Sequence, residues 1–297
     1  MNDDRIAEGS SIGAAGAPVA SELARTVEAF RVGMKQIPVR NPPASDLVVE
    51  QIQLGGVPTL RVLAPGGSAD QVICHFHGGG WVSGSAETHL GLLGELSRAA
   101  KATVVAPDYS LAPEHPFPTA YDESLRVYEA LRTSGHRFCV SGDSGGGGMA
   151  LGVLNHAALN GHSEVRAGLL ISSWADLRLE LPSIVQLAKR DMVVSADAMR
   201  LMVAAYATGI DLTDPRVSPL LGLKRRLPPL LIQVGSTEVL LDDSLEIDRR
   251  ARAVGGHVEL EVWPEMSHVW HLSTASLQDA HRAIRRAGNF LHEHLRT

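Results

Sequence analysis

Short apolar segments alternate with amphipathic ones along most of this 297-residue chain, and this alternation constrains the fold more than any other feature. Thr103 to Ala106 and Leu230 to Ile232 are typical apolar runs, short enough for strands buried on both faces of a sheet. Strands that alternate with helices predict a largely parallel sheet covered by helices. The strand-like segments are 47–54, 57–63, 71–76, 102–106, 137–141, 167–172, 229–234 and 257–263, and the helix-like segments are 18–35, 86–99, 119–133, 145–160, 242–254 and 274–295.

Two stretches break the alternation. Residues 1–45 contain a helical pattern before the first strand, and residues 180–210 contain two more between strands. An insertion after a central strand lies at the carboxyl edge of a parallel sheet, so we expect these two stretches to form a helical cap there. Residues 46–179 and 211–297 would then form the main domain.

Composition excludes several classes of protein. The formal net charge of −6 and the absence of a basic stripe argue against nucleic-acid binding. No apolar run reaches the roughly 18 residues that a membrane span needs, and the acidic start Met1 to Asp4 differs from a secretory signal. Cys74 and Cys139 lie in strand-like runs, where buried, reduced thiols are the usual state. We therefore expect a cytoplasmic protein without a membrane segment or a metal cluster.

The segment Gly142-Asp143-Ser144-Gly145-Gly146 carries the strongest chemical signal. It matches G-x-S-x-G, it follows a strand-like run, and it precedes a helix-like one. In this context the serine occupies a sharp strand-to-helix turn, and the glycines two residues on either side allow neighbouring backbone to approach. A phosphate-binding loop is the alternative, but a Walker loop requires a lysine that is absent here. We interpret Ser144 as a nucleophile.

A second glycine run, His77-Gly78-Gly79-Gly80-Trp81, follows the strand-like segment 71–76. Free backbone N–H groups in such a run can stabilise a negatively charged oxygen that develops during acyl transfer. The N–H of Gly145, directly after the nucleophile, is the expected additional donor. We interpret His77 as an organiser of this loop, because a tight turn around a structural histidine needs no catalytic role.

A serine nucleophile needs a base, and in this arrangement the chain order is serine, acid, histidine. His268 follows the last strand-like segment and is the preferred base, with His271 as its close rival. After segment 229–234 the acid could be Glu238, Asp242 or Asp243. The two aspartates also suit the start of a helix, so Glu238 is favoured, but the residues alone leave all three carboxylates open.

Together these motifs resemble the bacterial hormone-sensitive-lipase-like esterases, also called family IV. The resemblance rests on His77 to Trp81, Asp108 to Pro118, Gly142 to Gly146 and Asp214 to Leu220, and it spans most of residues 70–270. It implies an α/β-hydrolase fold with a mostly parallel eight-stranded sheet and a helical cap. It further implies Gly78, Gly79 and Gly145 as oxyanion donors. It places the acid at Glu238, where the family usually has aspartate, and this departure keeps Asp242, the second carboxylate of the family pattern, open as a substitute.

The resemblance implies a serine carboxylesterase that hydrolyses short-chain acyl esters through an acyl-enzyme intermediate and needs no cofactor. A non-catalytic small-molecule receptor on the same fold, and an amidase or thioesterase with the same triad, are the alternatives. Relatives of this kind often pair, so a homodimer is expected as well. The aromatic and methionine side chains that we expect to line the substrate pocket are Trp81, Tyr109, Trp174, Met202 and Tyr206.

Overall fold

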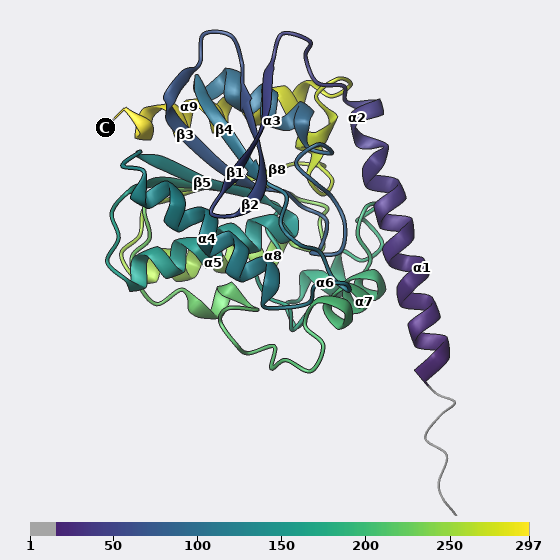
Figure 1. The fold of residues 1–297 in the computed structure, drawn as a ribbon. Helices are drawn as coiled ribbons and strands as arrows, with labels where there is room; N and C mark the ends of the chain where they lie inside the picture. The colour runs from purple at the N-terminus through teal and green to yellow at the C-terminus, as the bar shows by residue number, and fades with distance from the viewer. Residues whose placement is uncertain (1–15, 297) are drawn as a thin grey trace, which may run out of the picture.

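The fold is built around one sheet of eight strands in the order β1-β2-β4-β3-β5-β6-β7-β8 (Figure 1). The computed structural model describes residues 16–296. β2 runs antiparallel to its neighbours β1 and β4, and the remaining pairs are parallel. The strands are β1 (Val48–Leu54), β2 (Val57–Leu63), β3 (Ser68–Phe76), β4 (Ala102–Pro107), β5 (Phe138–Asp143), β6 (Val165–Ile171), β7 (Leu230–Gly235) and β8 (Val258–Trp263).

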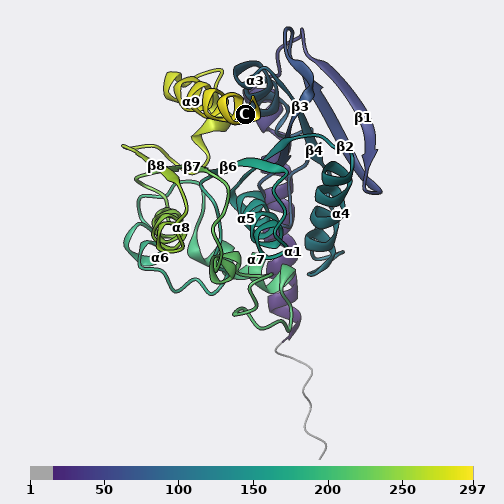
Figure 2. The same ribbon diagram turned by 90° about the vertical axis from the view of Figure 1, so that its left-hand side faces the viewer.

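Successive residues of the central strands point to opposite faces of the sheet, and each face is covered by helices. Ile73 belongs to one core cluster and Cys74 to the other, and Leu231 and Ile232 divide in the same way. Helices α3 and α9 cover one face, while α4, α5 and α8 cover the other (Figure 2). Burial on both faces explains why these strands are continuously apolar in sequence.

The helices lie close to their predicted ranges. The α-helices are α1 (Gly16–Lys35), α2 (Ile37–Arg40), α3 (Leu90–Ala100), α4 (Thr119–Thr133), α5 (Ser144–Leu159), α6 (Ser183–Gln186), α7 (Ala196–Tyr206), α8 (Leu241–Ala253) and α9 (Gln278–Leu295), and the 3₁₀ helices are η1 (Pro219–Gly222) and η2 (Trp270–Ser273). The predicted helix 86–99 begins later, at Leu90, because the residues before it form tighter turns. The N–H groups of His89 and Leu90 donate to the carbonyl oxygens three residues earlier, at Ala86 and Glu87, instead of four residues earlier as in an α-helix.

The hairpin between β1 and β2 forms as predicted, with Leu54 paired to Val57 across a two-residue turn. Gly55 and Gly56 have φ values of +60° and +78°, a conformation that is open to glycine and costly for most other residues. Within residues 16–296, no helix combines the length and the apolar character that are required to cross a bilayer.

Helix α1 packs against α7, so the N-terminal segment meets the mid-chain insertion in space (Figure 1). Residues 1–15 of the expected cap lie outside the described residues, and the division of the chain into cap and main domain stays a prediction. Arg31 of α1 donates to the carbonyl oxygens of Val82 and Ala112 and forms a two-pronged ion pair with Glu114. These contacts attach α1 to the loops that follow β3 and β4.

The mid-chain insertion is fastened to the loop after β7. Asp191 accepts the N–H of Val239 at 3.0 Å. Ser183 donates its hydroxyl to the Val239 carbonyl at 2.6 Å, and its N–H donates to Asp242 Oδ2 at 2.7 Å. The Asp242 N–H in turn donates to the Ser183 hydroxyl at 3.1 Å, so four hydrogen bonds join the insertion to this loop and to the start of α8.

Candidate active site

Ser144 occupies the sharp turn between β5 and α5, with φ at +52°. A side chain at Gly142 would place its Cβ 2.2 Å from the Gly146 carbonyl oxygen, and one at Gly146 would meet the Phe76 oxygen at 2.1 Å. Both distances are far below van der Waals contact, so these two glycines are needed for the strand, the turn and the helix to pack this closely. The turn presents the Ser144 hydroxyl at the carboxyl edge of the sheet.

Ser144, His268 and Glu238 form a continuous hydrogen-bonded chain. The Ser144 Oγ lies 2.9 Å from His268 Nε2, and His268 Nδ1 lies 2.8 Å from Glu238 Oε2. These residues come from the loops after β5, β8 and β7, which end at the same edge of the sheet. The structure therefore brings together the three residues that the sequence selected.

The hydrogen bonds determine the tautomer of His268. An ionised carboxylate only accepts hydrogen bonds, so Nδ1 carries the proton and donates it to Glu238. Nε2 is then left with a lone pair that can accept the Ser144 proton. Burial alone would lower the pKa of His268, but the hydrogen bond and negative charge of Glu238 raise it above its usual value. The imidazole is thus prepared to hold a positive charge.

The rival residues lie elsewhere. His271 is buried, and its Nε2 contacts Gln233 Oε1 at 2.9 Å. Asp242 accepts the Ser183 N–H, and Asp243 accepts the N–H groups of Ala175 and Asp176. Each rival is thus engaged in a contact that stabilises the fold.

The glycine run after β3 requires a correction to the predicted oxyanion donors. The Gly78 N–H donates to the buried carboxylate of Asp143 at 3.0 Å, so it is not available to a substrate. Gly79 and Gly80 line the pocket beside Ser144. The Gly80 nitrogen lies 3.2 Å from the position that a Gly145 Cβ would take. The N–H groups of Gly79, Gly80 and Gly145 are therefore the set that fits the oxyanion role, and the prediction of Gly78 was wrong.

Asp143 anchors this loop through a buried cluster that the sequence analysis missed, although the residue lies inside the G-x-S-x-G motif. Its Oδ1 contacts His75 Nε2 at 3.1 Å, and its Oδ2 lies 3.4 Å from His89 Nε2. Burial would raise the pKa of Asp143, but the charge of His89 and the hydrogen bonds of both histidines hold it well below its usual range. The pKa of His89 is raised by Asp143 against the opposing effect of burial. Each partner thus favours the charged form of the other beneath the nucleophile.

Ser144 and His268 open into a small, largely apolar pocket of about 130 Å³. It is bounded by the N-terminal segment, the mid-chain insertion and the loops that carry the acid and the base. Its apolar lining consists of Phe30, Met34, Ile37, Trp174, Val193, Val194, Met202, Leu240, Val269 and Leu272. Phe30, Met34 and Ile37 were not predicted, although their spacing places them on one face of a helical pattern.

Two of the five predicted pocket residues, Trp174 and Met202, line this pocket. The other three do not line it and instead pack in the core. Trp81 is stacked on Tyr206 with ring centroids 4.8 Å apart, and both are almost fully buried. Tyr109 is stacked on His77 and donates its hydroxyl to the His77 carbonyl at 2.6 Å. The prediction for these three aromatic residues was wrong because their rings support the glycine loop from behind.

The sequence pattern of the α/β-hydrolase-fold family matches residues 73–272, which include Ser144, Glu238 and His268. The chain belongs to this α/β-hydrolase family. The predicted fold, with its mostly parallel eight-stranded sheet flanked by helices, is confirmed. This α/β hydrolase is similar to an acetyl-hydrolase of Streptomyces hygroscopicus, with 37% identity over 78% of this chain and 79% of the relative. An esterase of Acinetobacter venetianus is 33% identical over 91% of this chain and 90% of the relative.

Solved structures agree with this assignment. An esterase/lipase from an uncultured bacterium shares 36% identity with this α/β hydrolase and superposes with a TM-score of 0.85. The superposition covers 95% of this chain and 100% of the other. An esterase of the bacterial hormone-sensitive lipase family shares 34% identity over 93% of this chain and 98% of its own, with a TM-score of 0.86. The resemblance to bacterial hormone-sensitive-lipase-like esterases is confirmed.

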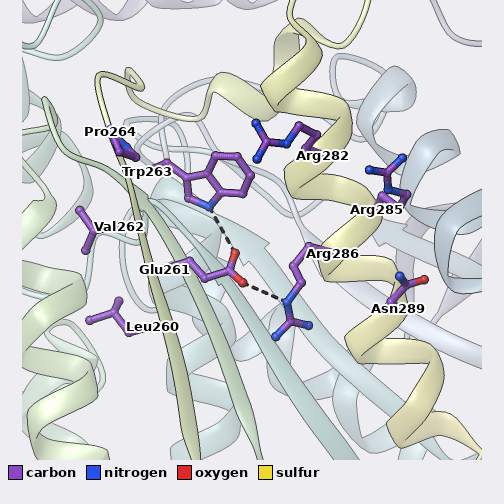
Figure 3. Close-up of a pocket in the computed structure, with 9 residues that line it drawn as sticks. All are labelled: Leu260, Glu261, Val262, Trp263, Pro264, Arg282, Arg285, Arg286 and Asn289. Atoms are coloured by element: carbon purple, nitrogen blue, oxygen red, sulfur yellow. Dashed lines mark hydrogen bonds and ion pairs between the residues drawn. The ribbon is translucent and has the colours of Figure 1, made fainter.

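A larger groove of about 690 Å³ lies along the edge strand β8 and helix α9 of this α/β hydrolase, away from Ser144 (Figure 3). Glu261 at its centre accepts the indole N–H of Trp263 and pairs with Arg286. Arg282 lies over the Trp263 ring and pairs with Asp279. Because none of the described serine, threonine, cysteine or histidine residues lines this groove, it offers no nucleophile or base for acyl transfer and is not the candidate active site.

Proposed function

We propose that this α/β hydrolase is a serine carboxylesterase that hydrolyses short-chain acyl esters, with Ser144 as nucleophile, His268 as base and Glu238 as acid. The prediction of a carboxylic ester hydrolase is confirmed at the level of reaction class by relatives named as esterases and as an acetyl-hydrolase. The catalytic residues and the acyl length are the proposal. The observation that carries it is the hydrogen-bonded chain from Ser144 Oγ through His268 to Glu238.

In the proposed reaction, Ser144 Oγ attacks the ester carbonyl while His268 Nε2 takes its proton. The N–H groups of Gly79, Gly80 and Gly145 stabilise the oxyanion, and each such donor typically contributes a factor of about 10²–10³ to the rate. The imidazolium, stabilised by Glu238, then protonates the departing alcohol. Water attacks the acyl-enzyme by the same route and releases the acid.

The size of the pocket supports a short acyl group. A volume of about 130 Å³ lies below the 300–1,000 Å³ that is usual for sites that enclose drug-sized ligands. Its apolar lining suits an alkyl chain and offers few polar partners. A related protein of 36% identity, EstE5, was soaked with p-nitrophenyl butyrate for its crystal structure. We expect p-nitrophenyl esters of two to six acyl carbons to be turned over best, and peak activity on palmitoyl esters would contradict this.

The test of the nucleophile is Ser144→Ala, compared with Ser173→Ala. Ser173 is fully buried, whereas Ser144 is 8% exposed, and the Ser173 hydroxyl has no hydrogen-bond partner within the described residues. Removal of a serine nucleophile costs up to about 10⁶ in kcat, so Ser144→Ala should retain almost no activity and the control most of it. A purified, folded Ser144→Ala protein that kept a tenth of the activity would disprove the assignment.

A fluorophosphonate label separates the esterase from the non-catalytic receptor, because only an activated serine reacts. Labelling of the wild-type protein at Ser144, and none of Ser144→Ala, is the expected result. Relative rates on matched ester, amide and thioester substrates distinguish the amidase and thioesterase alternatives. The cytoplasmic location and the homodimer stay predictions, and size-exclusion chromatography of the purified protein tests the second.

A further inference from the structure

We propose that Ser172 is a positioning residue for ester hydrolysis, because one hydroxyl holds both the acid Glu238 and the loop that carries the base His268. The inference rests on the proposed function, and it adds a fourth residue to the arrangement. Ser172 directly follows β6, the strand that lies between the nucleophile strand β5 and the acid strand β7. It is fully buried at the carboxyl edge of the sheet.

The Ser172 hydroxyl makes one hydrogen bond to each of the two loops. It donates to Glu238 Oε1 at 2.7 Å and accepts the N–H of Val269, the residue after the base, at 3.2 Å. Glu238 Oε1 also accepts the Gly235 N–H at 2.6 Å. Because Oε1 receives two donors, the carboxylate is held with Oε2 toward His268 Nδ1.

The backbone at both ends of this contact has left-handed dihedral angles. Ser172 has φ at +43° and Val269 has φ at +46°. This conformation is especially unfavourable for a β-branched residue such as valine, and it persists only where surrounding contacts enforce it. The hydrogen bond from Val269 N–H to Ser172 Oγ is such a contact. Val269 directly precedes the helix η2 in the chain. Ser172 thus helps to fix the backbone corner from which His268 extends.

A glutamate has one more rotatable bond than the aspartate that is usual at this position, so its carboxylate has more ways to turn away from the base. Glu238 is fully buried, and the two donors on Oε1 restrict that freedom. In Glu238→Asp the shorter side chain would draw the carboxylate back from the Ser172 hydroxyl. The contribution of Ser172 should therefore depend on the length of the acid.

The test compares Ser172→Ala with the neighbouring control Ser173→Ala in steady-state hydrolysis of p-nitrophenyl butyrate across pH 5–9. We expect kcat of Ser172→Ala to fall about 10- to 100-fold, the range for a lost hydrogen bond to an ionised group. KM should change less than about twofold, since positioning acts on the transition state. The acid limb of kcat/KM should move to lower pH, because a loosened Glu238 contact no longer raises the pKa of His268.

Two further variants keep the test decisive. Ser172→Gly removes the hydroxyl and also accommodates the positive φ, so it reports on catalysis even if Ser172→Ala folds poorly. In the Glu238→Asp background, Ser172→Ala should lower kcat by less than about threefold, because the Ser172 hydroxyl and the carboxylate at position 238 no longer interact there. Full additivity of the two changes, an unmoved acid limb, or a kcat within twofold of the Ser173→Ala control would each overturn the proposal. An unlabelled, inactive wild-type protein would instead refute the proposed function.

Discussion

Replacement of Asp143 by asparagine tests whether the buried cluster beneath the nucleophile supports the fold. The substitution keeps the shape of the side chain and removes its charge. The Asp143 carboxylate accepts the Gly78 N–H, contacts His75 and pairs with His89, and it is almost completely buried. An asparagine leaves His89 buried without its counter-charge. It also turns an amide N–H₂ toward groups that donate to the carboxylate.

The expected loss of stability follows from the cost of breaking a buried pair from one side, about 3–5 kcal/mol. The isosteric amide retains one oxygen that can still accept the Gly78 N–H, so we expect the lower end, about 3 kcal/mol. A change of this size lowers the melting temperature by roughly 6–12 °C in a domain of about 150–250 residues, so we expect the lower part of that range for this 297-residue chain. The Gly78 contact also weakens, which loosens the attachment of the glycine loop.

The difference in the free energy of unfolding between wild type and Asp143→Asn, which is the stability gap, should depend on pH. The folded-state pKa of Asp143 is lowered, so its contribution to stability is present above its unfolded value of about 3.9 and is lost as the pH falls below it. The pKa of His89 is raised, so its contribution is present below about 6.5 and is lost as the pH rises through the folded value. The gap should be widest between roughly pH 4 and 6.5.

Urea unfolding followed by circular dichroism at pH 4, 5.5 and 8 measures this gap. Asp214→Asn is the matched control, because Asp214 pairs with the more exposed Arg216 and such pairs contribute about 0–1 kcal/mol. If the free energy of unfolding of Asp143→Asn lay within about 1 kcal/mol of this control at pH 5.5, the reasoning would be refuted.

Three further changes probe the site. Glu238→Gln should move the acid limb of the kcat/KM pH profile to lower pH, because His268 loses the negative charge that raises its pKa. Asp242→Asn should leave the acid limb in place. A shift in Asp242→Asn and none in Glu238→Gln would make Asp242 the acid. Met202→Ala should enlarge the pocket and shift the acyl optimum to longer chains in a p-nitrophenyl ester series, and an unchanged profile would remove Met202 from the pocket wall. Arg31→Ala should raise KM about tenfold, because it releases α1 from the loops beside the pocket. Replacement of the exposed Arg25 on the same helix by alanine should leave KM unchanged. Equal KM values for the two variants would show that α1 is held by other contacts.

The sequence was informative wherever chemistry depends on a local pattern. The turn at Ser144, the strand ends that carry Glu238 and His268, and the alternation of buried strands are all encoded in short segments. The orientation of the Gly78 N–H was not accessible, because it depends on Asp143, a residue 65 positions away in the chain. A short sequence segment does not reveal that one of its backbone N–H groups already donates to a carboxylate far away in the chain.

The pocket was harder to predict for a related reason. Aromatic residues near a motif can face the substrate or support the motif from behind, and the sequence does not distinguish the two. Trp81 and Tyr206 stack on each other, whereas Trp174, from another strand end, lines the cavity. The contribution of Phe30 and Met34 depends on where α1 lies, and that position is set by tertiary contacts such as those of Arg31.

The hydrogen bonds of Ser183 and Asp191 to the loop after β7 have a consequence for protein engineering. A designer who transplants residues 180–210 from another hydrolase to alter substrate scope would also replace partners of Val239, the residue beside the acid. Such chimaeras should retain turnover only when residues 235–242 are transplanted with the insertion. These two segments therefore form one exchangeable module, although more than 20 residues separate them in the chain.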